Sequence, residues 1–164
     1  MVIGPESTGK STLSEALAKE LDTVWVPEYA RAYIDDLKRP YTEHDLLHIA
    51  KGQLALEDNI LQKANDFLVC DTDLNVIKVW SEHAFKRCHV EILEHIAQRK
   101  YDLYLLTNID IPWTEDPQRE HPDMRGYFYN IYLDIVQNSG VKWLDISGTH
   151  YERLRAAMAG VKAL

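Results

Sequence analysis

Residues 4–12 read Gly-Pro-Glu-Ser-Thr-Gly-Lys-Ser-Thr, which is a complete G-x-x-x-x-G-K-S/T pattern. Gly4 and Gly9 let the backbone curl so that successive N–H groups point inward, toward the oxygens of a phosphate. In this pattern Lys10 reaches the β- and γ-phosphates of a nucleotide, and the hydroxyl of Ser11 can bind Mg²⁺. The stretch therefore predicts a phosphate-binding loop with ATP and Mg²⁺ as its cofactors.

The residues on either side of the loop have the order that such a loop needs. Met1-Val2-Ile3 is apolar and fits a short strand, so we expect either a trimmed strand or a natural chain that begins slightly earlier. Leu13, Leu17 and Leu21 recur at helical spacing after the loop, and the start of that helix adds its positive dipole end. This context disfavours a glycine-rich turn without a nucleotide. The predicted nucleotide-binding residues are Gly4, Glu6, Ser7, Thr8, Gly9, Lys10, Ser11 and Thr12.

The composition fits one folded domain, which we expect to span residues 1–164. Hydrophobic residues make up 46% and charged residues 27%, which excludes a disordered chain. No apolar run approaches the roughly 20 residues that span a bilayer, and no signal sequence precedes the loop, so we expect a cytoplasmic protein without a membrane partner. The net charge of −8 argues against binding to nucleic acid.

Predicted strands and helices alternate along the chain. The strands cover 1–3, 23–26, 67–70, 103–106 and 141–144, and the helices cover 13–21, 28–37, 42–64, 74–80, 90–99, 126–137 and 151–161. This alternation is typical of an α/β fold with a parallel sheet between helices. Ligands of such sheets bind beyond the carboxyl ends of the strands. The polar residues that directly follow predicted strands are Glu28, Asp71, Asp73, Asn108, Asp110 and Thr149.

Acidic residues after two of these strands are candidates for catalysis. Asp71 follows an apolar run, as does the aspartate that helps to hold Mg²⁺ opposite a phosphate loop. Asp73 is either a second group in the same cleft or a helix cap. Glu28 can accept a proton from an attacking hydroxyl or bind a sugar diol, although a carboxylate also suits the first turn of a helix. Arg31 lies one turn on and can pair with Glu28 or contact phosphate.

The segment 108–125 is long for a connection inside so small a domain, and we expect it to form a lid. It contains Arg119 and Arg125, and an arginine that closes over a transferred phosphoryl group supplies charge-assisted donors. Trp113 lies in the same polar segment and can stack on a flat or cationic ring. An ordinary solvated loop, with Trp113 packed against a nearby tyrosine, is the alternative.

Taken together, these motifs resemble the kinase domain of the NadR-type NAD-biosynthesis proteins, and the resemblance covers nearly the whole chain. It implies a P-loop fold with a five-stranded parallel sheet in the order 2-3-1-4-5. It also implies phosphorylation of the 5′-hydroxyl of nicotinamide riboside by MgATP; adenylyltransferase and DNA-binding activities are not expected. The matching residues are Gly4–Ser11, Pro27–Arg31, Cys70–Asp73, Pro112, Trp113, Asp116 and Arg119.

The resemblance also implies roles for the candidate residues. Ser11 and Asp71 position Mg²⁺, Lys10 and Arg119 stabilise the transferred charge, and either Glu28 or Asp71 orients the attacking hydroxyl. The turn at Thr149 lies near the adenine, and Trp113 stacks on nicotinamide. The residues expected to bind the nucleoside are Glu28, Tyr29, Arg31, Asp71, Asp73 and Trp113.

Two other functions remain open at this point. A kinase for another nucleoside or nucleotide would keep every phosphate-handling residue and differ only in the pocket for the base. A regulatory ATPase would act on a partner's conformation and need no small acceptor. The lid and the carboxylates after the strands favour an enzyme with a small acceptor, and the oligomeric state stays open.

Overall fold

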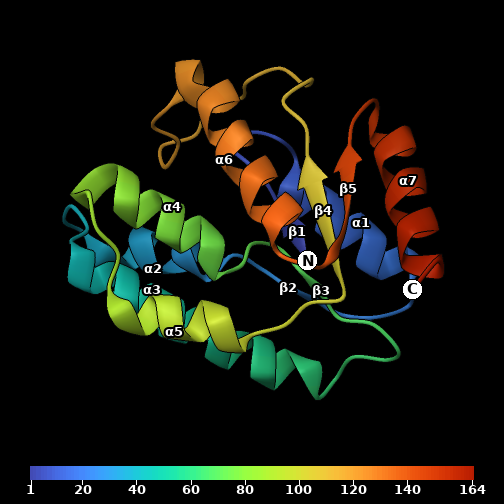
Figure 1. Cartoon of the computed structure of the whole chain (residues 1–164), viewed down its shortest axis with the longest axis horizontal. Coiled ribbons are helices and arrows are strands. Elements are labelled where there is room, and N and C mark those ends of the chain that lie inside the picture. Colours follow the sequence, from blue (N-terminus) through green and yellow to red (C-terminus); the bar gives the residue numbers. More distant parts are fainter.

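Short parallel strands and longer helices alternate along the computed structural model, which describes residues 1–164 (Figure 1). The strands are β1 (Val2–Ile3), β2 (Trp25–Val26), β3 (Val69–Cys70), β4 (Leu103–Thr107) and β5 (Lys142–Ile146). The α/β class is confirmed, and none of the helices is long and apolar enough to span a bilayer. The helices are α1 (Lys10–Glu20), α2 (Tyr29–Leu37), α3 (Glu43–Leu61), α4 (Leu74–Phe85), α5 (Val90–Gln98), η1 (Pro122–Met124), α6 (Arg125–Asn138) and α7 (His150–Lys162).

The strands form two parallel sheets and not the one five-stranded sheet that we predicted. One sheet has the order β1-β4-β5, and the other consists of β2 and β3. Between them there is a single bridge, from Val2 to Asp71, with the N–H of Thr72 donating to the carbonyl of Val2 at 3.0 Å. β1 and β3 have only two residues each, and the chain turns away toward α4 after the bridge, so no ladder forms across this seam.

The central strand β4 is buried on both faces, as a continuous apolar run predicts. Leu105 packs with Leu17 of α1 and Ala157 of α7. Its neighbour Leu106 points to the opposite face and packs with Val136 of α6. Helices α1 and α7 therefore cover one face of the sheet, and α6 covers the other (Figure 1).

Helices α2 to α5 form a second apolar cluster beside the sheets. The predicted capping box at the start of α3 is confirmed: Thr42 Oγ1 accepts from the N–H of Asp45, and Asp45 Oδ2 accepts from the N–H of Thr42. Arg39 also binds both carboxylate oxygens of Asp45, at 2.7 and 2.8 Å, and this hydrogen bonding holds the pKa of that carboxyl far below its usual range. The helical layer places α4 beside the carboxyl ends of the strands.

Candidate nucleotide and acceptor site

The loop between β1 and α1 has a tightly specified backbone. Gly4 has a φ of 148°, and a Cβ there would come within 2.4 Å of Thr107 Oγ1, so no larger residue fits. The hydroxyl of Thr8 donates to the carbonyl of Pro5 at 2.8 Å and also contacts the hydroxyl of Thr107 at 2.7 Å. Gly9, with a φ of 76°, caps α1 and leads directly into it. The N–H groups that begin the helix therefore face the loop's interior, where an anion would bind.

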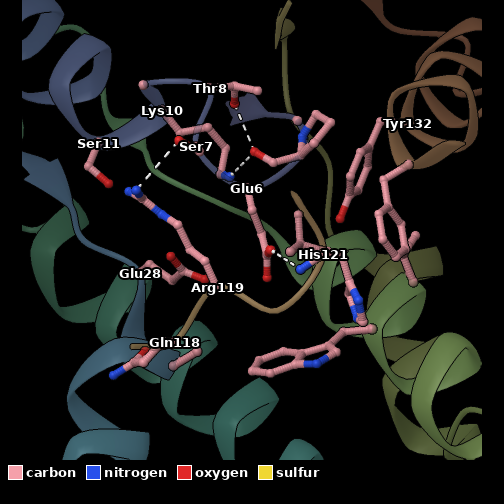
Figure 2. A pocket seen from close by; sticks show the side chains of 18 of the residues that line it. Glu6, Ser7, Thr8, Lys10, Ser11, Glu28, Gln118, Arg119, His121 and Tyr132 are labelled. Carbon is pink, nitrogen blue, oxygen red and sulfur yellow. Dashed lines mark hydrogen bonds between the residues drawn. The ribbon is translucent and has the colours of Figure 1, made fainter. Parts of the chain in front are cut away.

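A cavity of about 160 Å³ opens on this loop (Figure 2). All residues of the stretch 4–12 line it, together with Glu28 and Arg31 from the end of β2 and the start of α2. Arg119 and His121 line it from the predicted lid segment. The structure thus brings together the phosphate loop, one candidate carboxylate and the predicted lid arginine.

Two carboxyl groups near the phosphate loop have raised pKa values: Glu28, which lines the cavity, and Asp71, which is not among the lining residues. Burial raises the pKa of Asp71, which is 1% exposed, and neither of its carboxylate oxygens has a hydrogen-bond partner. Burial also raises the pKa of Glu28, while the charge of Lys10 lowers it in part. Lys10 opposes the shift at Asp71 as well, and the Ser11 hydroxyl, which is near Asp71 but outside hydrogen-bonding geometry, does so to a smaller extent. One ammonium group therefore lies close to two carboxyl groups, the arrangement expected where acid–base and metal chemistry meet.

Asp71 and Ser11 suit a magnesium ion by their chemistry. A buried carboxylate without a partner is costly unless a cation or donor is bound to it. No group of three or more His, Cys, Asp or Glu side chains could hold a metal by itself. A cation here would therefore take its oxygen ligands from Ser11, Asp71, water and a nucleotide, which is how Mg²⁺ is usually bound.

The segment 108–125 folds onto the phosphate loop. Ser7 Oγ accepts from the N–H of Thr114 at 2.8 Å and from Arg119 at 3.5 Å. Glu6 Oε2 accepts from the N–H of His121 at 3.3 Å, a contact drawn in Figure 2. Further along, Asp116 forms an ion pair of 2.9 Å with Arg31 of α2. Arg31 thus connects the predicted lid to α2, in addition to its contact of 3.6 Å with Glu28.

Besides Asp71 and Trp113, three predicted site residues do not line the cavity, and each has structural contacts of its own. Asp73 caps α4: its oxygens accept from the backbone and side chain of Asn75 at 2.9 and 2.6 Å and from the hydroxyl of Tyr104 at 3.1 Å. Tyr29 packs in the cluster of α2 to α5. Thr149 caps α7 through a capping box. The helix-cap interpretation accounts for the contacts of Asp73, and roles of these residues in binding stay predictions.

The aromatic rings that line the cavity are not the one that we expected. Trp113 does not line it, and its indole Nε1 is buried without a partner. Trp80 of α4 lines the cavity instead, together with Phe128 and Tyr132 of α6. The indole N–H of Trp80 donates to the hydroxyl of Tyr41 at 2.7 Å, which fixes the orientation of the ring. The sequence feature that could have indicated Trp80 is the apolar face of the predicted helix 74–80. Such a face indicates packing in the hydrophobic core equally well.

Comparison with known proteins places this site in a family. The family model described as an AAA domain matches residues 1–153. The chain is 26% identical over 159 residues to the trifunctional NAD biosynthesis/regulator protein NadR of Salmonella typhimurium and to that of Escherichia coli. Each alignment covers 92% of this chain and 38% of the relative, so the chain spans less than half the length of these proteins.

Solved structures of NadR have the same fold. The structure of a NadR protein in complex with NR superposes with a TM-score of 0.78 at 24% identity, covering 99% of this chain and 49% of that one. The structure in complex with NAD and AMP-PNP also has a TM-score of 0.78, at 21% identity, covering 97% of this chain and 48% of that one. The chain belongs to the AAA domain family of P-loop proteins and is similar over most of its length to NadR.

Proposed function

We propose that this chain is an ATP- and Mg²⁺-dependent kinase that phosphorylates the 5′-hydroxyl of nicotinamide riboside to give nicotinamide mononucleotide. The observation that carries the proposal is a single cavity in which the phosphate loop, the carboxylate of Glu28 and several aromatic rings meet. The similarity to NadR proteins, with solved complexes containing NR or AMP-PNP, supports both a nucleoside acceptor and ATP.

The phosphate loop would bind ATP. Its N–H groups and the start of α1 supply a positive potential for the phosphates. Lys10 and Arg119 both line the cavity and would stabilise the negative charge of the transferred phosphoryl group. Ser11 and Asp71 would hold Mg²⁺, which neutralises phosphate charge when it is bound.

Glu28 is the residue best placed to act on the acceptor hydroxyl. Its side chain is 20% exposed and lines the cavity, whereas Asp71 is enclosed. Because burial raises its pKa, the ionised form of Glu28 is a stronger proton acceptor than an ordinary glutamate. Glu28 would therefore orient the hydroxyl and accept its proton, and Asp71 would serve the metal.

The aromatic lining fits a flat, cationic base. Trp80, Phe128 and Tyr132 line the cavity together with Val76 and Val79 of α4. The nicotinamide ring of the riboside carries a positive charge, and an indole attracts a cation more strongly than it attracts a neutral ring. This compartment therefore favours nicotinamide riboside over uridine or adenosine, and Trp80 is the residue that would contact the ring.

Trp80→Ala is expected to raise the KM for nicotinamide riboside by about two- to thirtyfold, the range that a cation–π contact provides. The KM for ATP should change much less. Steady-state kinetics of the purified variant measures both values, and Trp113→Ala in parallel tests the stacking that we predicted from sequence. A larger effect from Trp113→Ala would mean that Trp113 of the predicted lid, and not Trp80, contacts the base.

Tyr41→Phe is the matched control for this variant. Trp80 packs against the Tyr41 ring, with centroids 4.8 Å apart, and phenylalanine keeps that ring while removing the hydrogen bond to the indole. Its KM for nicotinamide riboside should stay close to that of the unmodified protein. An equal rise in both variants would mean that the Trp80 effect arises from the hydrogen bond that orients the indole and not from contact of the indole with the base.

A mass-spectrometric screen of nucleosides with MgATP tests the proposed function. Nicotinamide riboside should be phosphorylated faster than uridine, adenosine or any other common nucleoside. Preferred phosphorylation of a different nucleoside would show a kinase of the same mechanism with another base pocket. ATP hydrolysis that no nucleoside accelerates would indicate a regulatory ATPase.

A further inference from the structure

Arg153 of α7 is the only lysine or arginine among the buried residues, with 4% of its surface exposed. Its guanidinium contacts three separate segments at the carboxyl ends of the strands. Nη1 donates to the carbonyl of Thr8 at 2.7 Å, Nε to the carbonyl of Gly148 at 3.0 Å, and Nη2 to the carbonyl of Asn108 at 3.1 Å. Nη2 also forms an ion pair with Asp110. A buried guanidinium with all these partners joins the phosphate loop to the segments after β4 and β5.

The contact with Thr8 determines the direction of a phosphate-loop amide. All peptide bonds are trans, so the N–H of each peptide unit points away from its carbonyl. Because Arg153 binds the carbonyl of Thr8, the N–H of Gly9 must point to the opposite side. Neither that N–H nor the N–H of Thr8 donates to any group of the chain. Both amides are therefore available to a ligand inside the loop.

A second arginine acts on the preceding peptide unit in the same way. Arg125 Nη2 donates to the carbonyl of Ser7 at 3.0 Å, which turns the N–H of Thr8 away from Arg125. Two guanidinium groups thus bind consecutive carbonyls on the outside of one loop. Of the two, Arg153 is the more firmly held, because Asp110 pairs with it and also accepts from the N–H of Gly148 at 2.6 Å.

We propose that Arg153 is a positioning residue for phosphate binding, which holds the Thr8–Gly9 peptide so that its N–H faces the bound phosphates. The inference rests on the proposed function only in taking the loop as a phosphate site. Its action requires the planar fork of a guanidinium, which donates in several fixed directions, whereas the ammonium of a lysine is a single point with freely rotating donors and would not hold these carbonyls in the same geometry.

The binding of tripolyphosphate to the whole chain, measured by calorimetry, tests this role without any acceptor. Arg153→Gln and Arg153→Lys are both expected to weaken binding by about ten- to a hundredfold, as for the loss of a charge-assisted hydrogen bond. Arg155→Gln is the control: Arg155 is an exposed residue of the same helix, and its replacement should change binding less than about twofold. Circular dichroism establishes that each variant is folded at the temperature of measurement.

Several results would overturn the proposal. If Arg153→Lys bound tripolyphosphate as the unmodified protein does, Arg153 would support phosphate binding through its positive charge and not by orienting the Thr8–Gly9 peptide. If both variants melted earlier but bound normally well below their melting temperatures, Arg153 would be a purely structural residue. Failure of the unmodified protein to bind tripolyphosphate would remove the phosphate site itself. Normal binding without phosphorylation of any nucleoside would contradict the proposed function and leave the role of Arg153 intact.

Discussion

Lys10→Ala is expected to lower phosphoryl transfer by about 100-fold or more, the scale on which a preorganised charge acts at a transition state. The fold should survive. Lys10 donates to the carbonyl of Pro5 at 2.8 Å, but the hydroxyl of Thr8 binds the same carbonyl at 2.8 Å and would keep the loop closed. Turnover with MgATP and a thermal melt of the same sample measure the two effects.

Lys19→Ala is the matched control, because Lys19 is an exposed residue in the last turn of the same helix. Its turnover should remain close to that of the unmodified chain. Near-normal turnover in Lys10→Ala would contradict the assignment of the phosphate loop to catalysis. A variant that no longer melts cooperatively would show that Lys10 supports the loop more than we infer.

Asp71→Asn is expected to weaken the response to Mg²⁺ by about tenfold or more, since even an outer-shell partner of a metal is worth about that much. An amide is a poorer ligand than a carboxylate for a hard cation. Titration of activity against Mg²⁺ at saturating ATP measures the effect. Glu28→Gln is the comparison: it should keep the Mg²⁺ response and lose turnover or acceptor binding. If Glu28→Gln lost the Mg²⁺ response and Asp71→Asn lost only turnover or acceptor binding, Glu28 would serve the metal and Asp71 the acceptor.

The same Asp71 variant should be more stable than the unmodified chain when no ligand is bound. Burial raises the pKa of Asp71 above its ordinary value of 3.8, so the folded state binds this proton more tightly than the unfolded state. The contribution of Asp71 to stability is thus greatest below pH 3.8 and is lost as the pH rises through the raised pKa. Above that pKa the ionised carboxylate carries the full penalty of a buried charge, on the order of 1 kcal/mol or more, and the neutral asparagine lacks this charge.

Thermal melts of the ligand-free proteins across this pH range test the linkage. The gain in melting temperature from Asp71→Asn should be largest at neutral pH and shrink as the pH approaches 3.8. A gain that does not depend on pH would mean that the stabilisation has another source than the charge. Lower stability of the variant at neutral pH would show that the carboxylate has a partner in the folded chain.

Local patterns were sufficient to predict the elements of this fold. The apolar run before Asp71, the leucine spacing after the phosphate loop and the capping box at Thr42 depend on neighbours in sequence, and each feature is present in the structure. The division into two sheets was not predictable in this way. It depends on how many backbone hydrogen bonds connect Val2 with the chain after β3, which is a property of the folded backbone.

The site was predictable where the motif specifies its own geometry and not where distant segments meet. The phosphate loop and Glu28 line the cavity as the sequence suggested. Trp113 was chosen because it lies in a polar segment, whereas the tryptophan that lines the cavity is Trp80, on a helix with an apolar face. No pattern in the sequence indicated a role for Arg153, because the carbonyls that it binds are backbone groups far away in sequence.

The most direct test of the proposed kinase function is the stoichiometry of product formation by the purified chain supplied with MgATP and nicotinamide riboside. A riboside kinase forms one ADP and one nicotinamide mononucleotide for each ATP consumed, with the new phosphate on the 5′-oxygen. The proposed function also predicts that ADP formation becomes slow when the riboside is omitted. ADP released at the same rate with and without the riboside, and with no phosphorylated nucleoside, would contradict it.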